Sequence, residues 1–254
     1  MSETVSLNVL NNKPTGYLVY DGPSQLDGKP IVCIATLSSN NEKTGDMIQT
    51  WILRKDLRPL EAIAQNEDSS ICGDCKHRGS GHGKQRSCYV SVYTAPTRVY
   101  DAFIRGRYPE KPLEEIVGGR SIRFGSYGDP AALPLNLLVN AAKASAGYTA
   151  YTHSWKHIAP EYRQICMASV DSRQEYLEAK CLGWRTFRTR LSTHKVYSRE
   201  LICPASAENN IRTCETCLAC CGTHFDERNK AGDVCIVIHG SPAAIRSYNH
   251  NRTR

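Results

Sequence analysis

The feature that most restricts the fold of this chain is a loop in which three cysteines must meet. The loop reads Cys72-x-x-Cys75, then twelve residues, then Cys88, and three glycines among those twelve residues let it fold back. Two cysteines at this spacing can face one metal from a tight turn, and three thiolates leave a fourth coordination position. His77 or His82 fills that position in a zinc site, whereas on an iron–sulfur cubane it stays open. The alternative without metal is a redox pair with an incidental third cysteine.

A second cysteine loop lies near the C-terminus. It contains Cys203 and then Cys214-x-x-Cys217-x-x-Cys220, followed directly by Cys221. This spacing favours a cubane over a zinc ribbon, which uses two separated CxxC pairs. Cys203 is the expected fourth ligand and Cys221 a spare. The alternative is a structural zinc that holds the loop together.

The number of cysteines also indicates the compartment. The chain has twelve, and its first residues show no basic flank followed by an apolar run, so we expect no secretory signal. In a reducing cytoplasm clustered cysteines are metal ligands or redox groups, and a disulfide framework is the alternative. No apolar stretch is long enough to span a membrane. Four further cysteines lie in apolar segments and are expected in the core: Cys33, Cys166, Cys181 and Cys235.

The remaining pattern is an alternation of short strands and helices. Strands are predicted at Gly16–Tyr20, Ile31–Thr36, Met47–Arg54, Ser121–Gly125, Tyr148–Thr152, Cys166–Val170, Trp184–Arg188 and Val234–His239. Helices are predicted at about 97–106, Leu133–Ala146 and Ser172–Leu182, the last with Ser172 as N-cap. Alternation of this kind predicts βα units and a parallel sheet.

These elements lead to a specific expectation for the fold. We expect an α/β chain with a small N-terminal β module at residues 1–60. Residues 61–254 are expected to form a partial (β/α)6 TIM-like barrel carrying both cysteine loops. A doubly wound open sheet is the alternative, and both folds place chemistry at the carboxyl ends of the strands.

The order of motifs resembles the radical S-adenosylmethionine family. A three-cysteine loop comes first, a helix follows, and a strand then ends in Gly125-Ser126-Tyr127-Gly128-Asp129-Pro130. Members of that family carry a Gly-Gly-Glu-Pro-like turn at this place. The family's usual cysteine spacing is CxxxCxxC, which this loop does not have. Residues 70–240 also resemble small uncharacterised phage-encoded proteins with a cysteine-rich loop, a strand ending in a GD turn and a YTH strand.

The resemblance implies cofactors and an activity. Cys72, Cys75 and Cys88 would hold a [4Fe–4S] cluster whose open iron binds S-adenosylmethionine, and the cleaved cofactor would yield a 5′-deoxyadenosyl radical. The turn after the strand would contact the cofactor through Gly125, Tyr127, Gly128, Asp129 and Pro130. The second cysteine group resembles the auxiliary clusters of some members, so one or two clusters are expected.

Two further residues end predicted strands where an active site would lie. His153 is a candidate for hydrogen bonding or proton transfer, and Asp171 for binding a ribose hydroxyl or a substrate amine. The structural alternatives are a hydrogen-bonded core histidine and a helix cap.

A basic strand suggests a rival function. The segment after Trp184 carries Arg185, Arg188, Arg190 and Lys195, and the chain has a formal net charge of +7. These side chains are candidates to contact the phosphates of a nucleotide or a nucleic acid, or they form a solvated basic edge. The rival is therefore a zinc-containing, phage-type nucleic-acid-binding protein, and a third possibility is a non-catalytic iron–sulfur protein.

Overall fold

The computed structural model describes residues 13–79, 85–223 and 232–252, which form a mixed α/β structure with two five-stranded sheets. The first sheet has the order β1-β2-β3-β4-β5. Its strands are β1 (Gly16–Pro23), β2 (Pro30–Thr36), β3 (Ile48–Arg54), β4 (Ser121–Tyr127) and β5 (Gly147–Thr149). The pairs β1–β2 and β2–β3 are antiparallel, whereas β3–β4 and β4–β5 are parallel.

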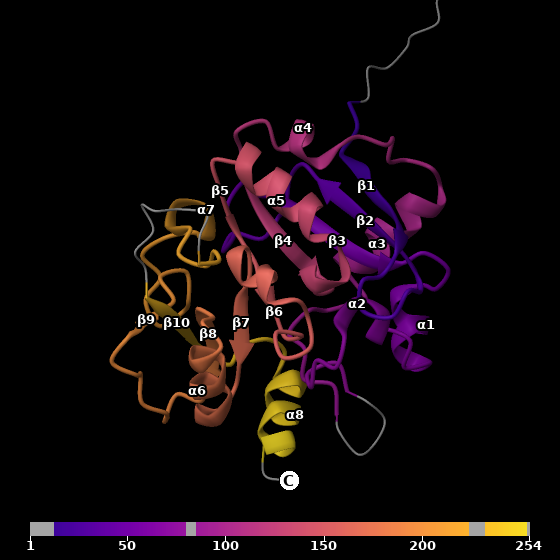
Figure 1. The fold of residues 1–254 in the computed structure, drawn as a ribbon. Coiled ribbons are helices and arrows are strands. Elements are labelled where there is room, and N and C mark those ends of the chain that lie inside the picture. Colours follow the sequence, from indigo (N-terminus) through magenta and orange to yellow (C-terminus); the bar gives the residue numbers. More distant parts are fainter. Residues whose placement is uncertain (1–12, 80–84, 224–231, 253–254) are drawn as a thin grey trace, which may run out of the picture.

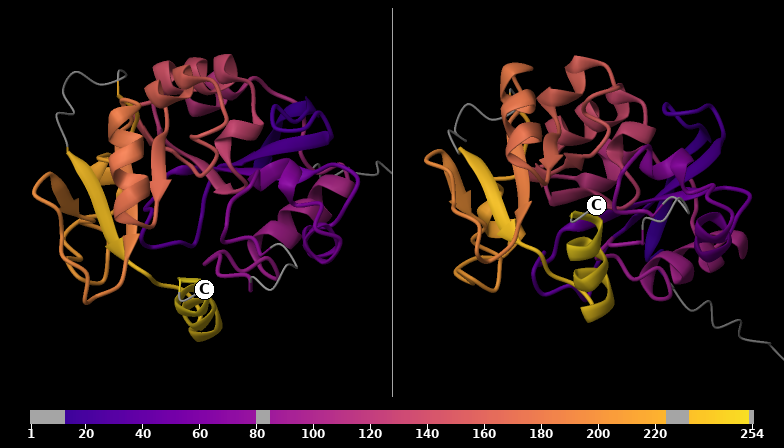
Figure 2. Two further views of the ribbon diagram at one scale, coloured as in Figure 1. Left: turned by 60° about the horizontal axis from the view of Figure 1, so that its bottom comes forward. Right: turned by 90° about the horizontal axis from the view of Figure 1, so that it is seen from below.

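The second sheet has the order β6-β7-β8-β10-β9, and all of its neighbouring strands are parallel. Its strands are β6 (Tyr151–Thr152), β7 (Met167–Val170), β8 (Thr186–Arg190), β9 (Glu200–Ile202) and β10 (Asp233–Val237). Only Ala150 separates β5 from β6, so the chain passes directly from one sheet into the other. The two sheets follow one another around an arc (Figure 2).

Most of the helices lie between parallel strands along the chain, and the last one follows β10. They are α1 (Pro59–Ala64), α2 (Ser69–Cys72), α3 (Ala95–Ile104), α4 (Leu113–Val117), α5 (Leu135–Ala144), α6 (Arg173–Cys181), α7 (Cys214–Cys217) and α8 (Pro242–Arg252), with short 3-10 turns η1 (Pro130–Ala132) and η2 (Pro160–Gln164). Figure 1 shows α5 lying across β4, and α8 at the lower edge, below β6 and β7. Among the described residues, no helix is long and apolar enough to cross a membrane.

The core explains why the central strands form where they do. In β2, Ile31 to Ala35 are fully buried, which is why this run is continuously apolar rather than alternating. The main core joins β2, β3 and β4 to the helices through side chains such as Ile52, Phe124 and Leu138. A second, smaller cluster lies in the other sheet around Met167, Val234, Ile236, Cys203 and Cys220.

The sequence predictions for single elements are largely confirmed. All eight predicted strands and all three predicted helices are present, although Ala150 divides the strand predicted at Tyr148–Thr152. The Oγ atom of Ser172 accepts the N–H of Glu175, so Ser172 caps α6 as predicted. The predicted domain boundary near residue 60 falls between β3 and β4, which pair within one sheet.

Near the end of the chain, α8 continues to Arg252. Asn251 exchanges hydrogen bonds with Gln85, donating over 2.8 Å and accepting over 3.2 Å, and this holds the end of the helix. Cys181 was expected in the core but is exposed at the end of α6, whereas Cys33, Cys166 and Cys235 are buried as predicted.

Candidate functional site

The first cysteine loop is folded back by its own backbone. Cys72 is the last residue of α2, and the N–H of Cys75 donates to its carbonyl over 3.2 Å. The N–H groups of Ser87 and Cys88 both donate to the carbonyl oxygen of His77 over 2.9 Å, which returns Cys88 to the start of the loop. Burial raises the pKa of Cys72, and the charges of Asp68, Cys75 and Cys88 raise it further, so the three thiols lie within electrostatic reach of one another.

A buried ion pair between Asp68 and Arg78 holds this loop in its folded-back conformation. Asp68 is 1% exposed and accepts hydrogen bonds from Arg78 Nε over 3.0 Å and from Arg78 Nη2 over 2.7 Å. Arg86 Nη1 lies 3.4 Å from the other carboxylate oxygen. Because both arginines belong to the segment between Cys75 and Cys88, Asp68 holds the two ends of the loop together. Sequence reasoning missed this residue, which looked like one more charge in a polar loop.

The turn after β4 is attached directly to the cysteine loop. The backbone N–H of Asp129 donates to the carbonyl oxygen of Ile71 over 2.6 Å. The carboxylate of Asp129 is buried and accepts the N–H of Ala131 over 2.9 Å and the N–H of His153 over 2.8 Å. Each carboxylate oxygen of Asp129 therefore accepts a hydrogen bond from a backbone N–H group, and these bonds position the turn and the end of β6.

Close packing explains the glycines of the turn. Gly128 has φ +81°, and a Cβ added there would lie 2.7 Å from the Cβ of Ile52. Gly125 has φ +69°, and a Cβ there would lie 2.7 Å from the carbonyl oxygen of Gly128. Both positions require a left-handed backbone without a side chain. The predicted contact residues Gly125, Tyr127, Gly128 and Asp129 line the cavity described below, and Pro130 begins η1 behind them.

The second cysteine group gathers four of its five candidate residues. Cys203 follows β9, and its N–H donates to the carbonyl of Cys235 over 2.8 Å. Cys214 and Cys217 are the ends of α7, and the carbonyl of Cys220 accepts the N–H of Ala150 over 3.0 Å. Burial raises the pKa of Cys220; a hydrogen bond with Tyr151 opposes that rise, and the charges of Cys203, Cys214 and Cys217 add to it.

Cys221 points away from this group. Its sulfur accepts a hydrogen bond from Arg185 Nη1 over 3.3 Å, and it packs in the main core. Its proposed role as a spare ligand therefore has no geometric support.

Both cysteine groups line one cavity, whose volume is about 320 Å³. The first group contributes Cys72, Cys75 and Cys88, and the second contributes Cys203, Cys214, Cys217 and Cys220. Between them lie side chains from the inner face of the strands, including Arg123, Thr149, Tyr151, Ser169 and Phe187. Alternate residues of a strand share one face, which is why β4, β6, β7 and β8 each present such residues to the same space.

Among the described residues, neither cysteine group brings three sulfurs within 4.8 Å of one another. A tetrahedral zinc ion with Zn–S bonds of about 2.3 Å holds its sulfurs about 3.8 Å apart. Within the described part of the chain, the set of three ligand atoms that all lie within 4.8 Å of one another is His77, His153 and Asp171. A cubane carries its thiolates on separate iron atoms and therefore holds them further apart than one ion does.

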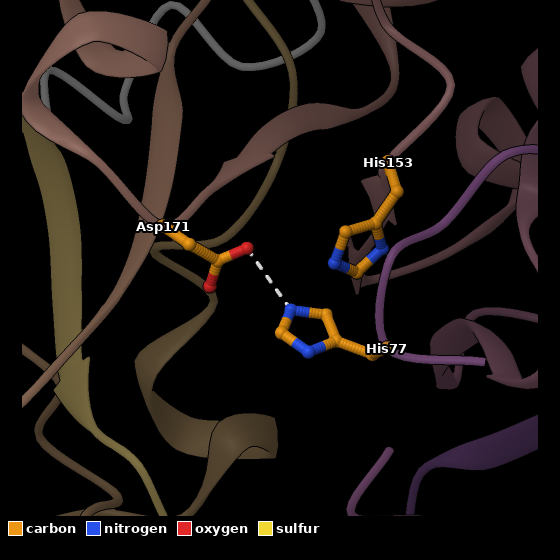
Figure 3. Close-up of side chains that lie close together, drawn as sticks. All are labelled: His77, His153 and Asp171. Atoms are coloured by element: carbon orange, nitrogen blue, oxygen red, sulfur yellow. Dashed lines mark hydrogen bonds and ion pairs between the residues drawn. The ribbon is translucent and has the colours of Figure 1, made fainter. Parts of the chain in front are cut away.

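His77, His153 and Asp171 converge beside the first cysteine loop. Figure 3 shows the two imidazole rings and the carboxylate pointing toward one another. Asp171 Oδ2 lies 2.9 Å from His77 Nε2 and 3.0 Å from Lys76 Nζ. The pKa of Asp171 is lowered, because the charges of His77 and Lys76 outweigh the opposing effect of burial.

Within the group of His77, His153 and Asp171, the charge of the carboxylate is already balanced by the ammonium of Lys76. The two nitrogens and one oxygen of the group are a donor set that suits a divalent cation. The ammonium of Lys76, however, lies on the same carboxylate oxygen that a cation would use. His77 Nδ1 is 2.9 Å from Ser87 Oγ, so both ring nitrogens of His77 have partners and it does not serve as a fourth ligand to the cysteines. His82, the other predicted ligand, lies outside the described residues.

The C-terminal helix α8 closes over this group. The ring of Tyr248 stacks on His77 with centroids 5.6 Å apart, and its hydroxyl donates to the carbonyl oxygen of Thr189 over 3.2 Å. Tyr248 is only 2% exposed. Sequence reasoning missed this contact, because the polar end of the chain gives no periodic signal.

The predicted phosphate contacts of the basic strand are wrong for three arginines. Arg188 is 2% exposed and makes a bidentate pair with Glu200, with both N···O distances 2.6 Å. Arg190 is 3% exposed and pairs with Glu208 over 2.5 Å. Arg185 donates to the carbonyls of Ala219, Cys221 and Gly232. These three guanidinium groups form hydrogen bonds and ion pairs with other residues of the chain. Lys195, by contrast, is exposed.

Comparison with known proteins adds no relative: no protein-family model, no curated protein sequence and no solved structure matches this chain. Function is therefore inferred from the geometry of the cavity and from the order of the motifs that line it.

Proposed function

We propose that the chain is an iron–sulfur enzyme of the radical S-adenosylmethionine type. The observation that carries the proposal is that three cysteine sulfurs and the turn after β4 line the same cavity, tied by the Asp129–Ile71 hydrogen bond. Had the turn lain at the opposite end of the strands, it could not contact a cofactor bound at the cysteines.

The topology supports the proposal. The parallel strands β3, β4 and β5 of the first sheet and β6, β7 and β8 of the second lie in chain order within their sheets, and β10 then lies between β8 and β9. The three-cysteine loop follows β3, and the glycine-rich turn ends β4. We interpret this order as a partial (β/α)6 barrel, in which parallel strands bring their carboxyl ends to one edge. The antiparallel strands β1 and β2 extend one side of it.

We assign iron rather than zinc from the order of motifs along the chain. Three thiolates, those of Cys72, Cys75 and Cys88, would hold a [4Fe–4S] cluster. One iron would then lack a protein ligand, since His77 is engaged by Ser87 and Asp171. A cluster held there would supply one-electron reductive cleavage of bound S-adenosylmethionine to methionine and a 5′-deoxyadenosyl radical, which would take a hydrogen atom from the substrate.

The residues that surround the cavity would bind and orient the cofactor and the substrate. The hydroxyl of Tyr127 is buried and has no hydrogen-bond partner within the described part of the chain. Tyr127 lines the cavity and lies within electrostatic reach of Cys72. It is therefore available to a bound cofactor. Asp129 holds the turn in place. His153 and Asp171 lie at the carboxyl ends of β6 and β7, and His153 lines the cavity, where it can hydrogen-bond a ligand.

The second cysteine group would hold a second cubane. Cys203, Cys214, Cys217 and Cys220 supply one thiolate for each iron, which closes the coordination. Such a cluster stabilises the loop or relays electrons. Both clusters require a reducing compartment, which we take to be the cytoplasm of a bacterium or of a phage-infected cell.

Metal analysis after anaerobic purification tests the proposal. We expect brown protein with about eight irons per chain, four for each cubane. Cys72→Ala should lower this number by about four, whereas Cys181→Ala, which changes the exposed cysteine outside both groups, should leave it unchanged. Colourless protein containing zinc would contradict the proposal.

A further inference from the structure

Arg123 is the charged side chain that lies between the two cysteine groups. It is on β4 and lines the cavity, and its Nη2 donates to the hydroxyl of Tyr89, the residue after Cys88, over 2.8 Å. Its charge also acts on Cys214 and Cys220 of the second group. Burial lowers the pKa of Arg123 and these neighbours raise it, with a net upward direction, so the guanidinium stays charged.

This arginine has no carboxylate partner among the described residues, unlike Arg188 and Arg190. The described carboxylate that lines the cavity, Asp129, holds backbone N–H groups. Lys43 also lines the cavity, and its charge acts on Cys203 and Cys214. A guanidinium has five N–H donors, so beyond its bond to Tyr89 Arg123 can donate charge-assisted hydrogen bonds to an anion in the cavity.

A second, independent feature points to the same place. Thr149 is the register partner of Arg123 in the neighbouring strand β5. It is 1% exposed, it lines the cavity, and its hydroxyl has no hydrogen-bond partner among the residues that the structure describes. A buried hydroxyl without a partner is uncommon, and a bound anion would accept its hydrogen bond.

An aromatic wall adjoins these two groups. The guanidinium carbon of Arg123 lies 5.7 Å from the centroid of the Tyr151 ring, and the rings of Tyr151 and Phe187 have centroids 4.5 Å apart. Tyr151 and Phe187 line the cavity as well. The wall suits a flat ring, because ring pairs gain contact energy beyond the area they bury.

We infer that Arg123 and Thr149 bind the anionic group of a small substrate, a phosphate or a carboxylate, whose planar part lies against Tyr151 and Phe187. The inference rests on the proposed function, since it takes this cavity as the substrate site of that enzyme. Because Arg123 lies between the two cysteine groups, an anion bound to it would leave the sulfurs of the first group to the cofactor.

Calorimetric titration of the anaerobic protein, with its metal, tests the inference without requiring turnover. The probes are phenyl phosphate and benzoate, with benzyl alcohol as the neutral comparison. We expect saturable binding of at least one anionic probe and none of benzyl alcohol, and the stronger anion identifies the anionic group. Arg123→Gln should weaken binding about tenfold or more, because a hydrogen bond to a charged group is lost.

Two variants complete the design. Thr149→Val keeps the shape of the side chain and should weaken binding about fivefold, which tests the site even if Arg123→Gln does not fold. Arg98→Gln changes an exposed arginine on α3 and should have no effect. Binding that is unchanged in either cavity variant, or absent for both anions, would overturn the inference.

A further titration separates the inference from the proposed function. Saturating S-adenosylmethionine should leave binding of the anionic probe unchanged. Competition between the two would assign Arg123 to the cofactor and overturn the inference. Anion binding in a protein that fails to cleave S-adenosylmethionine would instead leave the inference standing and reject the proposed reaction.

Discussion

The N–H of Asp129 donates to the carbonyl oxygen of Ile71 over 2.6 Å, and this bond joins the turn after β4 to the residue before Cys72. It connects two segments that are far apart in sequence and places them on one cavity. The carboxylate of Asp129 continues the connection to the N–H of His153, at the end of β6. One residue therefore fixes the relative positions of the cysteine loop, the turn and the next strand.

Close packing at Gly128 predicts a severe effect of a single methyl group. Gly128→Ala should lower the free energy of unfolding by about 3 kcal/mol or more, because left-handed strain and overlap with Ile52 both act. Gly119→Ala is the matched control: its φ is +80° and nothing lies within 4 Å of an added Cβ, so it should cost about 1 kcal/mol. Denaturant titration measures both, and equal losses would contradict this explanation.

The charges around Asp171 predict a pH dependence of stability. Because its pKa is lowered in the folded protein, its contribution is present above the unfolded pKa of about 4 and is lost as pH falls below that value. Asp171→Asn should therefore lower the free energy of unfolding by about 2 kcal/mol at pH 7, because Lys76 and His77 lose the carboxylate that they share. Unfolding measured across pH should show this deficit shrinking below pH 4. A deficit that grows on acidification would contradict the assignment.

The second cysteine group predicts a contrast between neighbours in sequence. Cys217→Ala should remove about four irons, because it takes one of four thiolates from a closed cluster. Cys221→Ala should keep its iron, since that sulfur faces Arg185 and the main core. Iron and sulfide analysis of the two variants checks this. Equal iron loss in both would show that Cys221 is a ligand.

The contact between α8 and the cysteine loop predicts a protective role for Tyr248. Tyr248→Phe should lower the free energy of unfolding by about 1 kcal/mol, through loss of the bond to Thr189. Tyr248→Ala should cost about 3 kcal/mol and should speed the loss of iron in air several-fold, since it uncovers His77. Tyr93→Ala, at a residue 77% exposed, is the control. Unchanged stability in air for Tyr248→Ala would contradict this role.

The strands and helices were predictable because their signals are local. Buried β-branched runs such as Ile31–Thr36 and the cap at Ser172 act within a few residues, and the structure confirms both. The cysteines that the spacing grouped together line one cavity, and their role as metal ligands stays a prediction. Cys221 is the exception, because adjacent residues point to different sides of the chain.

The parts that could not be predicted depend on contacts between distant segments. Nothing in the sequence around Arg188 shows that Glu200 neutralises it, so a buried ion pair looked like a basic surface. The pairing of Asp68 with Arg78 and the stacking of Tyr248 on His77 were hidden for the same reason. The sequence also gave no sign that the two cysteine loops share one cavity, since parallel strands far apart in the chain bring them together.

Reductive cleavage of S-adenosylmethionine tests the central claim most directly. The anaerobic protein should be reduced with dithionite, mixed with S-adenosylmethionine, and analysed for 5′-deoxyadenosine. We predict that 5′-deoxyadenosine and methionine form, and that a variant with Cys72, Cys75 and Cys88 changed to Ala forms neither while keeping the iron of the second group. Protein that holds its full iron but yields no 5′-deoxyadenosine, or a triple variant that yields as much as the natural chain, would contradict the account.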